Sequence, residues 1–180
     1  KFKYNIFKNL KSIPIKAEAF IIDIWGVLWD GIEVYDNAIN CLQYLKYKNI
    51  PIILLSNAPR RTKNVIERLK KNGITPDLYN HVISSGEFCR QAFINKSIYT
   101  KNLGTNFFFL GLDFDKGLLD GLPYKETSLS DAHFVLLCGA RDLSHKLNVY
   151  HDELNNIFEL KLPLICVNPD KTIIRKDGEL

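Results

Sequence analysis

Polar residues stand at the ends of three short apolar segments, where an α/β protein would place its chemistry. They are Asp23 in the first segment, Ser56 at the end of the second with Asn57 next to it, and Ser84 at the end of the third followed by Ser85. An acid in so apolar a segment loses hydration free energy unless a partner offsets its charge. A bound divalent cation would do so and would keep the carboxylate ionised. The ionised carboxylate of Asp23 can then attack phosphorus and form an acyl-phosphate.

The residues around these segment ends fit a phosphate-binding site. Gly26 follows Asp23 closely and lets the backbone approach a ligand. Ser56 offers a hydroxyl, and a helix is expected to start near Pro59, where its free amides and dipole would attract an anion. Each signal alone has a structural explanation, because such residues also serve as helix caps or turn residues. Two signals at the ends of consecutive strands together favour the functional interpretation.

The elements that would position these residues alternate between strands and helices. Short apolar runs predict strands at residues 19–25, 50–56, 81–84, 106–110, 133–138 and 164–167, the first buried on both faces. Helices are predicted after a cap at Asp36, from Pro59 to Gly73, and across residues 113–121 and 144–160. This alternation predicts an α/β fold with a Rossmann-like parallel sheet, followed by a second, smaller α/β domain.

Composition and charge narrow the classes of function. The formal charge is +4, and beyond residue 18 lysines and acids are interleaved, which argues against nucleic-acid binding. Residues 1–16 hold five lysines and no acid, and we favour a solvated edge over a targeting or binding arm. No apolar run approaches the roughly 18 residues of a membrane helix. Four dispersed cysteines without a CxxC pair argue against zinc and fit reduced thiols in a cytoplasmic protein.

The motifs around Asp23 and Ser56 resemble those of a known enzyme family. DIWGVLWDG resembles motif one of haloacid dehalogenase-like hydrolases, and LLSNAPR resembles their motif two. The following VISSGE is similar to the class IIA branch, which carries a cap domain after the third strand. The resemblance extends through FFFLGLDFDKGLLDGL, HFVLLCGA and CVNPDKTIIRKDGEL, nearly the whole chain. It implies a Rossmann-like core over residues 1–84, an α/β cap over 85–168, and a return toward the core over 169–180.

The resemblance also implies roles for individual residues. Asp23 would be the nucleophile for a small phosphomonoester, and it would ligate Mg²⁺ together with the backbone carbonyl of Trp25. Ser56 would bind the transferring phosphoryl group, with Asn57 supporting the same loop and Gly26 close to the ligand. The cap, including residues 168–170, would close over the site and select the substrate. Asp170 fits equally well as a turn residue after a proline.

The chain departs from the family pattern in two respects. The second aspartate of the family's DxD motif acts as general acid and base, and Trp25 stands in its place. Tryptophan can act neither as a general acid nor as a general base, and general acid–base catalysis is worth roughly 10²–10⁴-fold in rate. A variant of motif one with tryptophan occurs in a sub-branch resembling this sequence, and Trp25 can instead pack against the cap or the substrate.

The second departure is that the family's lysine and further acids after the cap are missing. Lys171 and Lys176 lie too close to the cap exit to take the place of that lysine. We expect an incomplete core, with an open sheet edge and exposed apolar surface.

These observations favour a Mg²⁺-dependent phosphatase that is weak or inactive as this chain. The alternative is a non-catalytic protein that still binds a phosphorylated ligand. An oxidoreductase with a nucleotide cofactor is excluded, because the first strand leads into DIWGVLWDG and not into a GxGxxG loop. The expected partner is a small phosphorylated molecule. We expect binding to neither nucleic acid nor a membrane. Whether the chain forms a homo-oligomer through the cap is left open.

Overall fold

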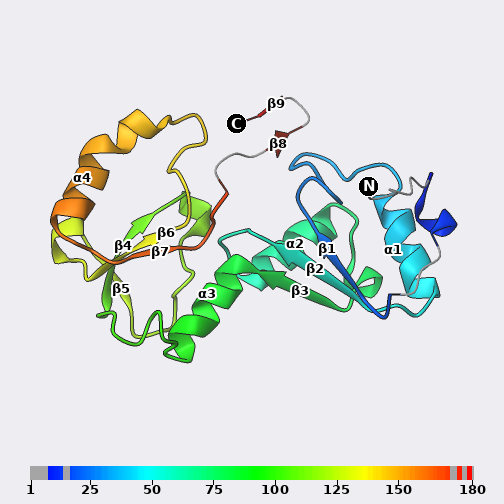
Figure 1. Ribbon diagram of the computed structural model, residues 1–180, viewed down its shortest axis with the longest axis horizontal. Helices are drawn as coiled ribbons and strands as arrows, with labels where there is room; N and C mark the ends of the chain where they lie inside the picture. The colour runs from blue at the N-terminus through cyan, green and yellow to red at the C-terminus, as the bar shows by residue number, and fades with distance from the viewer. Residues whose placement is uncertain (1–7, 14–16, 171–173, 176–177, 180) are drawn as a thin grey trace, which may run out of the picture.

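The computed structural model describes residues 8–13, 17–170, 174–175 and 178–179. Two parallel sheets lie at opposite ends of the molecule, with one helix between them (Figure 1). The α/β fold class predicted from the sequence is therefore confirmed. The basic segment over residues 1–16 lies largely outside the described residues, as do Lys171 and Lys176.

The first sheet holds the three strands that lead to the candidate site. They are β1 (Phe20–Asp23), β2 (Ile52–Ser56) and β3 (His81–Ser84), paired in parallel in the order β1-β2-β3. Helices α1 (Ala38–Tyr47) and α2 (Thr62–Lys71) make the crossovers. Each connection leads to the neighbouring strand in the same direction, and crossovers between parallel strands are right-handed. Both helices therefore cover the same face of the sheet.

The core of this half therefore lies on one side of the sheet. Ile52 and Leu54 are fully buried there, with Leu42 of α1 and Leu69 of α2 in the same apolar cluster. The opposite face is open: Ile21 is 68% exposed, and Leu55 and Ile83 are each 43% exposed. The prediction that the first strand is buried on both faces is wrong for the described residues, because they supply helices to only one face.

The second sheet is covered on both faces. Its strands are β4 (Asn106–Leu110), β5 (Lys125–Glu126), β6 (Phe134–Leu137) and β7 (Leu164–Cys166), all parallel, in the order β5-β4-β6-β7. Helix α3 (Ser85–Ile94) packs through Phe93 on one face, where the ring stacks on Phe134. Helix α4 (His151–Glu159) packs through Ile157 in a separate apolar cluster.

Short elements complete the described chain. They are the 3-10 helices η1 (Leu10–Ser12), η2 (Pro76–Leu78), η3 (Asp113–Asp115), η4 (Leu129–Asp131) and η5 (Leu147–Tyr150), and the antiparallel pair β8 (Ile174–Arg175) and β9 (Gly178–Glu179). No described helix has the length and apolar character needed to cross a membrane. The predicted division at residues 84/85 and 168/169 stays a prediction.

Several helix predictions are wrong in detail. Residues 113–121 form only η3 and turns, because Gly117 and Gly121 adopt left-handed backbone angles, with φ of 83° and 74°. The cap of α1 is Asn37 and not Asp36, and its side chain makes no capping hydrogen bond. The helix predicted over 144–160 is η5 followed by α4.

Helix α3 was not predicted, although its start has a recognisable signature. The Ser84 hydroxyl accepts a hydrogen bond from the backbone N–H of Glu87 at 3.2 Å. Serine followed three residues later by glutamate is the capping-box pattern. This helix joins the two sheets in sequence.

Candidate active site

Asp23 and Ser56 lie at the same edge of the first sheet. Asp23 is the last residue of β1 and pairs with Leu55, and Ser56 is the last residue of β2. The Ile24 N–H donates to the Leu55 carbonyl at 3.2 Å, which extends the pairing one residue past β1. The structure thus brings together the two motifs at the carboxyl ends of adjacent parallel strands, where α/β sheets bind ligands.

The Asp23 carboxylate is exposed at this edge and makes one short local contact. Its Oδ1 accepts a hydrogen bond from the Ile24 N–H at 2.9 Å. Partial burial raises the pKa of Asp23, the Ile24 N–H opposes that rise, and the negative charge of Asp170 adds to it. Asp170 is therefore close enough to Asp23 for their charges to repel.

Asp170 reaches the site from the far end of the chain. The Asn57 side-chain amide donates to Asp170 Oδ1 at 3.0 Å. The Asp170 N–H donates to Asn168 Oδ1 at 3.0 Å, which is a local turn contact. The first contact favours Asp170 as a residue of the site, and the second favours it as a turn residue. The Asp170 carboxylate lies beside motif two.

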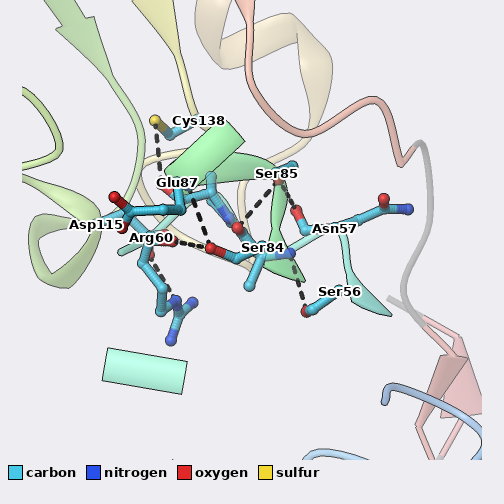
Figure 2. A network of polar contacts seen from close by, with 10 residues as sticks. Ser56, Asn57, Arg60, Ser84, Ser85, Glu87, Asp115 and Cys138 are labelled. Atoms are coloured by element: carbon cyan, nitrogen blue, oxygen red, sulfur yellow. Dashed lines mark hydrogen bonds and ion pairs between the residues drawn. The ribbon is translucent and has the colours of Figure 1, made fainter. Parts of the chain in front are cut away.

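The loop after β2 is held in place by the start of α3. The Ser85 hydroxyl donates to the Asn57 carbonyl at 2.7 Å, and the Ser84 hydroxyl donates to the Arg60 carbonyl at 2.8 Å. Figure 2 shows both serines pointing toward this loop. The Ser56 hydroxyl accepts from the Ala58 N–H at 3.1 Å, which closes a tight turn. Ser84 and Ser85 thus support the loop that directly follows Ser56.

Gly86 allows the start of α3 to approach the same loop. A Cβ at position 86 would lie 2.5 Å from the backbone N and O of Arg60. Backbone atoms cannot yield as a flexible side chain would, so this close approach requires glycine. Helix α2 begins at Thr62, not near Pro59 as predicted. Its first free N–H, on Thr62, donates to Glu87 Oε2 of α3 at 3.3 Å.

Trp25 folds back onto its own loop. Its ring packs edge-on against Trp29, with ring centroids 5.4 Å apart. A Cβ at Gly31 would lie 2.3 Å from the Trp25 ring, so that ring lies directly over the glycine. Gly26 has φ of 78°, and its N–H donates to the Trp29 carbonyl at 2.8 Å. Glycine is needed at position 26 for this left-handed turn.

Two further residues connect the motif-two loop to the second sheet. Arg60 Nε lies 3.0 Å from Asp115 Oδ1, and the two side chains are 17% and 4% exposed. The Arg60 guanidinium also lies over the Phe114 ring, 4.6 Å from its centroid. Burial raises the pKa of Asp115, and the positive charges of Arg60 and Arg68 oppose that rise. The motifs gave no sign of this pair, because each residue alone is an ordinary loop residue.

Oxygen donors near Asp23 suit a hard cation. The Asp23 and Asp170 carboxylates are close enough to repel, and the Trp25 carbonyl follows in the same loop. Mg²⁺ and Ca²⁺ prefer oxygen ligands, and a cation would relieve repulsion between two carboxylates. Among the described residues, no three His, Cys, Asp or Glu side chains come together as a complete ligand set.

Solved structures with similar folds include several hydrolases. A haloacid dehalogenase-like family hydrolase from Brucella suis 1330 matches at 26% identity and a TM-score of 0.86, over 97% of this chain and 62% of that chain. A p-nitrophenyl phosphatase from Archaeoglobus fulgidus matches at 18% identity and a TM-score of 0.65, over 91% and 59%. A glycerol phosphate phosphatase from Mycobacterium tuberculosis, in complex with calcium, matches at 14% identity and 0.63, over 91% and 46%.

The sequence identities to the two phosphatases are low, so the similarity to these structures shows a shared fold and nothing more. The chain spans less than two thirds of the length of the Brucella suis protein. A comparison with curated protein sequences gave no significant match. A family model described as haloacid dehalogenase-like hydrolase matches residues 20–115, more than half of the chain, including the ends of β1 and β2. The chain therefore belongs to the haloacid dehalogenase-like hydrolase family.

Proposed function

We propose that the chain carries the nucleophile half of a Mg²⁺-dependent phosphatase acting on a small phosphomonoester. The observation that carries this proposal is the placement of Asp23 and Ser56 at the ends of adjacent parallel strands. This placement lies inside the segment that matches the family model. The similar structures from Archaeoglobus fulgidus and Mycobacterium tuberculosis bear phosphatase names, which supports the same class of reaction.

The reaction would proceed in two displacements at phosphorus. An Asp23 carboxylate oxygen attacks the phosphorus atom, the bond from phosphorus to the ester oxygen breaks, and the ester oxygen leaves with the bonding electrons and takes a proton from water to become the alcohol. Water then attacks the phosphorus of the aspartyl-phosphate and loses a proton to the solvent, and the bond from phosphorus to the Asp23 oxygen breaks, which releases inorganic phosphate and restores the Asp23 carboxylate. Ser56 and the amides of its loop would orient the phosphoryl group, and such positioning supplies much of the rate in phosphoryl transfer.

The residues that would hold Mg²⁺ are Asp23 and the Trp25 carbonyl, and the neighbouring Asp170 carboxylate fits the same preference for oxygen. A bound Mg²⁺ would offset the negative charge of phosphate and carboxylate as they approach. Within this chain, Asn57 positions Asp170 through the hydrogen bond from its side-chain amide.

The direct test is hydrolysis of an aryl phosphate in the presence of Mg²⁺. We expect slow turnover, which Asp23→Asn abolishes, because an amide cannot replace the attacking carboxylate. Asp36→Asn is the matched control, since this exposed acid lies in the loop before α1. Robust turnover that is abolished by Asp23→Asn would contradict the prediction of weak activity, but it would support the proposed reaction with Asp23 as the nucleophile. Turnover that persists in Asp23→Asn would contradict the proposed nucleophile.

The packing of Trp25 favours a second candidate, a non-catalytic protein that binds a phosphorylated ligand. Trp25 packs against Trp29 and Gly31 in place of a residue able to transfer protons. In that case calorimetry with inorganic phosphate would show binding that depends on Ser56, while aryl phosphates would not be hydrolysed even with Mg²⁺. The homo-oligomer formed through the cap stays a prediction, which sedimentation velocity would check.

A further inference from the structure

A small cavity lies between the loop after β1, the loop after β2, and α2. Its volume is about 60 Å³. Apolar side chains form much of its wall, namely Ile24, Val65, Leu69 and Ile74. Ser56 and Trp25 also line it, so the cavity adjoins the candidate phosphate site. A cavity of 150 Å³ accommodates benzene, so this one suits a ligand of only a few heavy atoms.

The charged residues that line the cavity are both cations. Among the residues that the structure describes, Arg60 and Arg68 line it together with Trp29, and no acidic side chain does. Arg60 is paired with Asp115, which does not line the cavity. Among the described residues Arg68 forms no salt bridge, and its guanidinium lies over the Trp29 ring, 4.3 Å from the centroid. Arg60, Arg68 and Asp115 together leave one net positive charge at the cavity.

Trp29 adds a buried donor that lacks an acceptor. Its side chain is 7% exposed, and its Nε1 has no hydrogen-bond partner among the described residues. An unsatisfied buried N–H is costly, and native structures usually satisfy it with protein, water or a ligand. The indole N–H and the guanidinium of Arg68 are both donors. A ligand that satisfies them must therefore present acceptor atoms.

We propose that this cavity binds a small aliphatic carboxylate, whose charge meets Arg68 and whose oxygen accepts from Trp29. A single negative charge matches the net positive charge of the cluster, and a planar carboxylate matches the planar guanidinium fork. The short aliphatic part of the ligand would contact Ile24, Val65 and Leu69. This site does not depend on phosphoryl transfer and goes beyond the proposed function.

The chain contains a natural reporter for this proposal. Its only two tryptophans, Trp25 and Trp29, both line the cavity. Titration with propionate at constant ionic strength should therefore change the tryptophan fluorescence along a saturating curve. Propionamide is the matched ligand, because it keeps the size and planarity of propionate but lacks its charge. We expect it to bind at least about tenfold more weakly.

Two variants of α2 distinguish propionate binding in the cavity from general attraction of anions to a positively charged helix. Arg68→Gln should weaken propionate binding by about tenfold or more, as expected for loss of a charge-assisted contact. Arg68 and Lys70 are both exposed cations of this helix, but Lys70 does not line the cavity, so Lys70→Gln should leave binding unchanged. Circular dichroism would verify that both variants fold.

Trp29→Phe tests the indole donor directly. It retains an aromatic ring for Arg68 to stack on but removes the N–H, so calorimetry should show weaker propionate binding. The proposal is wrong if propionate gives no saturable signal by fluorescence or calorimetry, or if propionamide binds equally well. It is also wrong if Arg68→Gln has no effect. Binding of inorganic phosphate alone, with the same dependence on Arg68, would instead make the cavity part of the phosphate site.

Discussion

At the scale of single residues, the proposed phosphatase reaction makes Trp25 the residue that should decide which leaving groups the site releases. The family motif places a proton donor at this position, and the indole ring cannot supply one. The ring instead stabilises its own loop through contacts with Trp29 and Gly31. The lack of a proton donor should therefore slow the hydrolysis of a phosphomonoester with a poor leaving group more than that of one whose alcohol leaves readily as an anion.

Trp25→Asp should increase turnover of an alkyl phosphate much more than turnover of an aryl phosphate. General acid help is worth roughly 10²–10⁴-fold, and the aryl leaving group needs little of it. Steady-state rates with both substrates would measure the difference, and Trp25→Phe is the control that removes the indole without adding an acid. An equal effect on both substrates would mean that Trp25 acts through loop structure alone.

Asp23 should show a pKa above the ordinary value of about 3.9 for an aspartate. Protonation removes its nucleophilicity, so any phosphoryl transfer should decline as the pH falls through this raised pKa. Asp170→Asn removes the repelling charge and should shift the Asp23 titration to lower pH. Carbon NMR of the side-chain carboxyl groups in the metal-free chain would measure the shift. Asp36→Asn should leave the Asp23 titration unchanged, and an unchanged titration in Asp170→Asn would contradict the coupling.

At the scale of elements, the start of α3 supports the motif-two loop. Ser84 and Ser85 donate to carbonyls of that loop, and Gly86 permits their close approach. The apolar strands could be predicted from sequence, because short apolar runs mark strands in parallel sheets. The meeting of Asp23 and Ser56 could also be predicted, because ends of adjacent parallel strands share one edge.

The remaining contacts of the site could not be predicted in the same way. Asn57 and Asp170 are 113 residues apart and meet only through the folded chain. Arg60 and Asp115 likewise belong to loops that follow strands of different sheets. Local patterns carry no information on such pairs. By contrast, α3 has a local capping signal at Ser84, but Ser84 and Ser85 also fit the end of a strand, and that interpretation hides the helix.

Gly86→Ala should destabilise the chain and disturb the motif-two loop. The added Cβ would meet the backbone of Arg60 at 2.5 Å, and relieving such overlap costs about 1–3 kcal/mol. Urea denaturation followed by circular dichroism would measure the loss. Glu67→Ala introduces the same side chain at an exposed position of α2 and should change stability by no more than about 0.5 kcal/mol. Equal effects of the two substitutions would contradict this close packing.

At the scale of the whole molecule, the Arg60–Asp115 pair joins the two halves. Both partners are largely buried, so removing one leaves a charge without its partner in a poorly hydrated environment. The Cys138 thiol lies at the same contact, 3.9 Å from the Pro59 carbonyl (Figure 2). The position of the second sheet is thereby coupled to the loop that directly follows Ser56.

Asp115→Ala should destabilise the chain by about 3–5 kcal/mol, as for other buried pairs that lose one partner. The double variant Arg60→Met with Asp115→Leu should recover much of this loss, because neither buried charge remains. Urea denaturation of all variants would test this. Asp113→Ala is the control, because Asp113 is 94% exposed and pairs with Lys116 at the surface. A loss no greater than that of the control would show that the pair does not hold the halves together.

The open face of the first sheet affects how the folded chain should behave toward hydrophobic dyes. Ile21, Leu55 and Ile83 present apolar surface at the side opposite α1 and α2. A dye such as ANS should bind there and fluoresce while the near-ultraviolet circular dichroism still reports fixed aromatic packing. Dye binding is commonly taken as a sign of a molten globule. For this chain it would instead report a well-packed native sheet with one bare face.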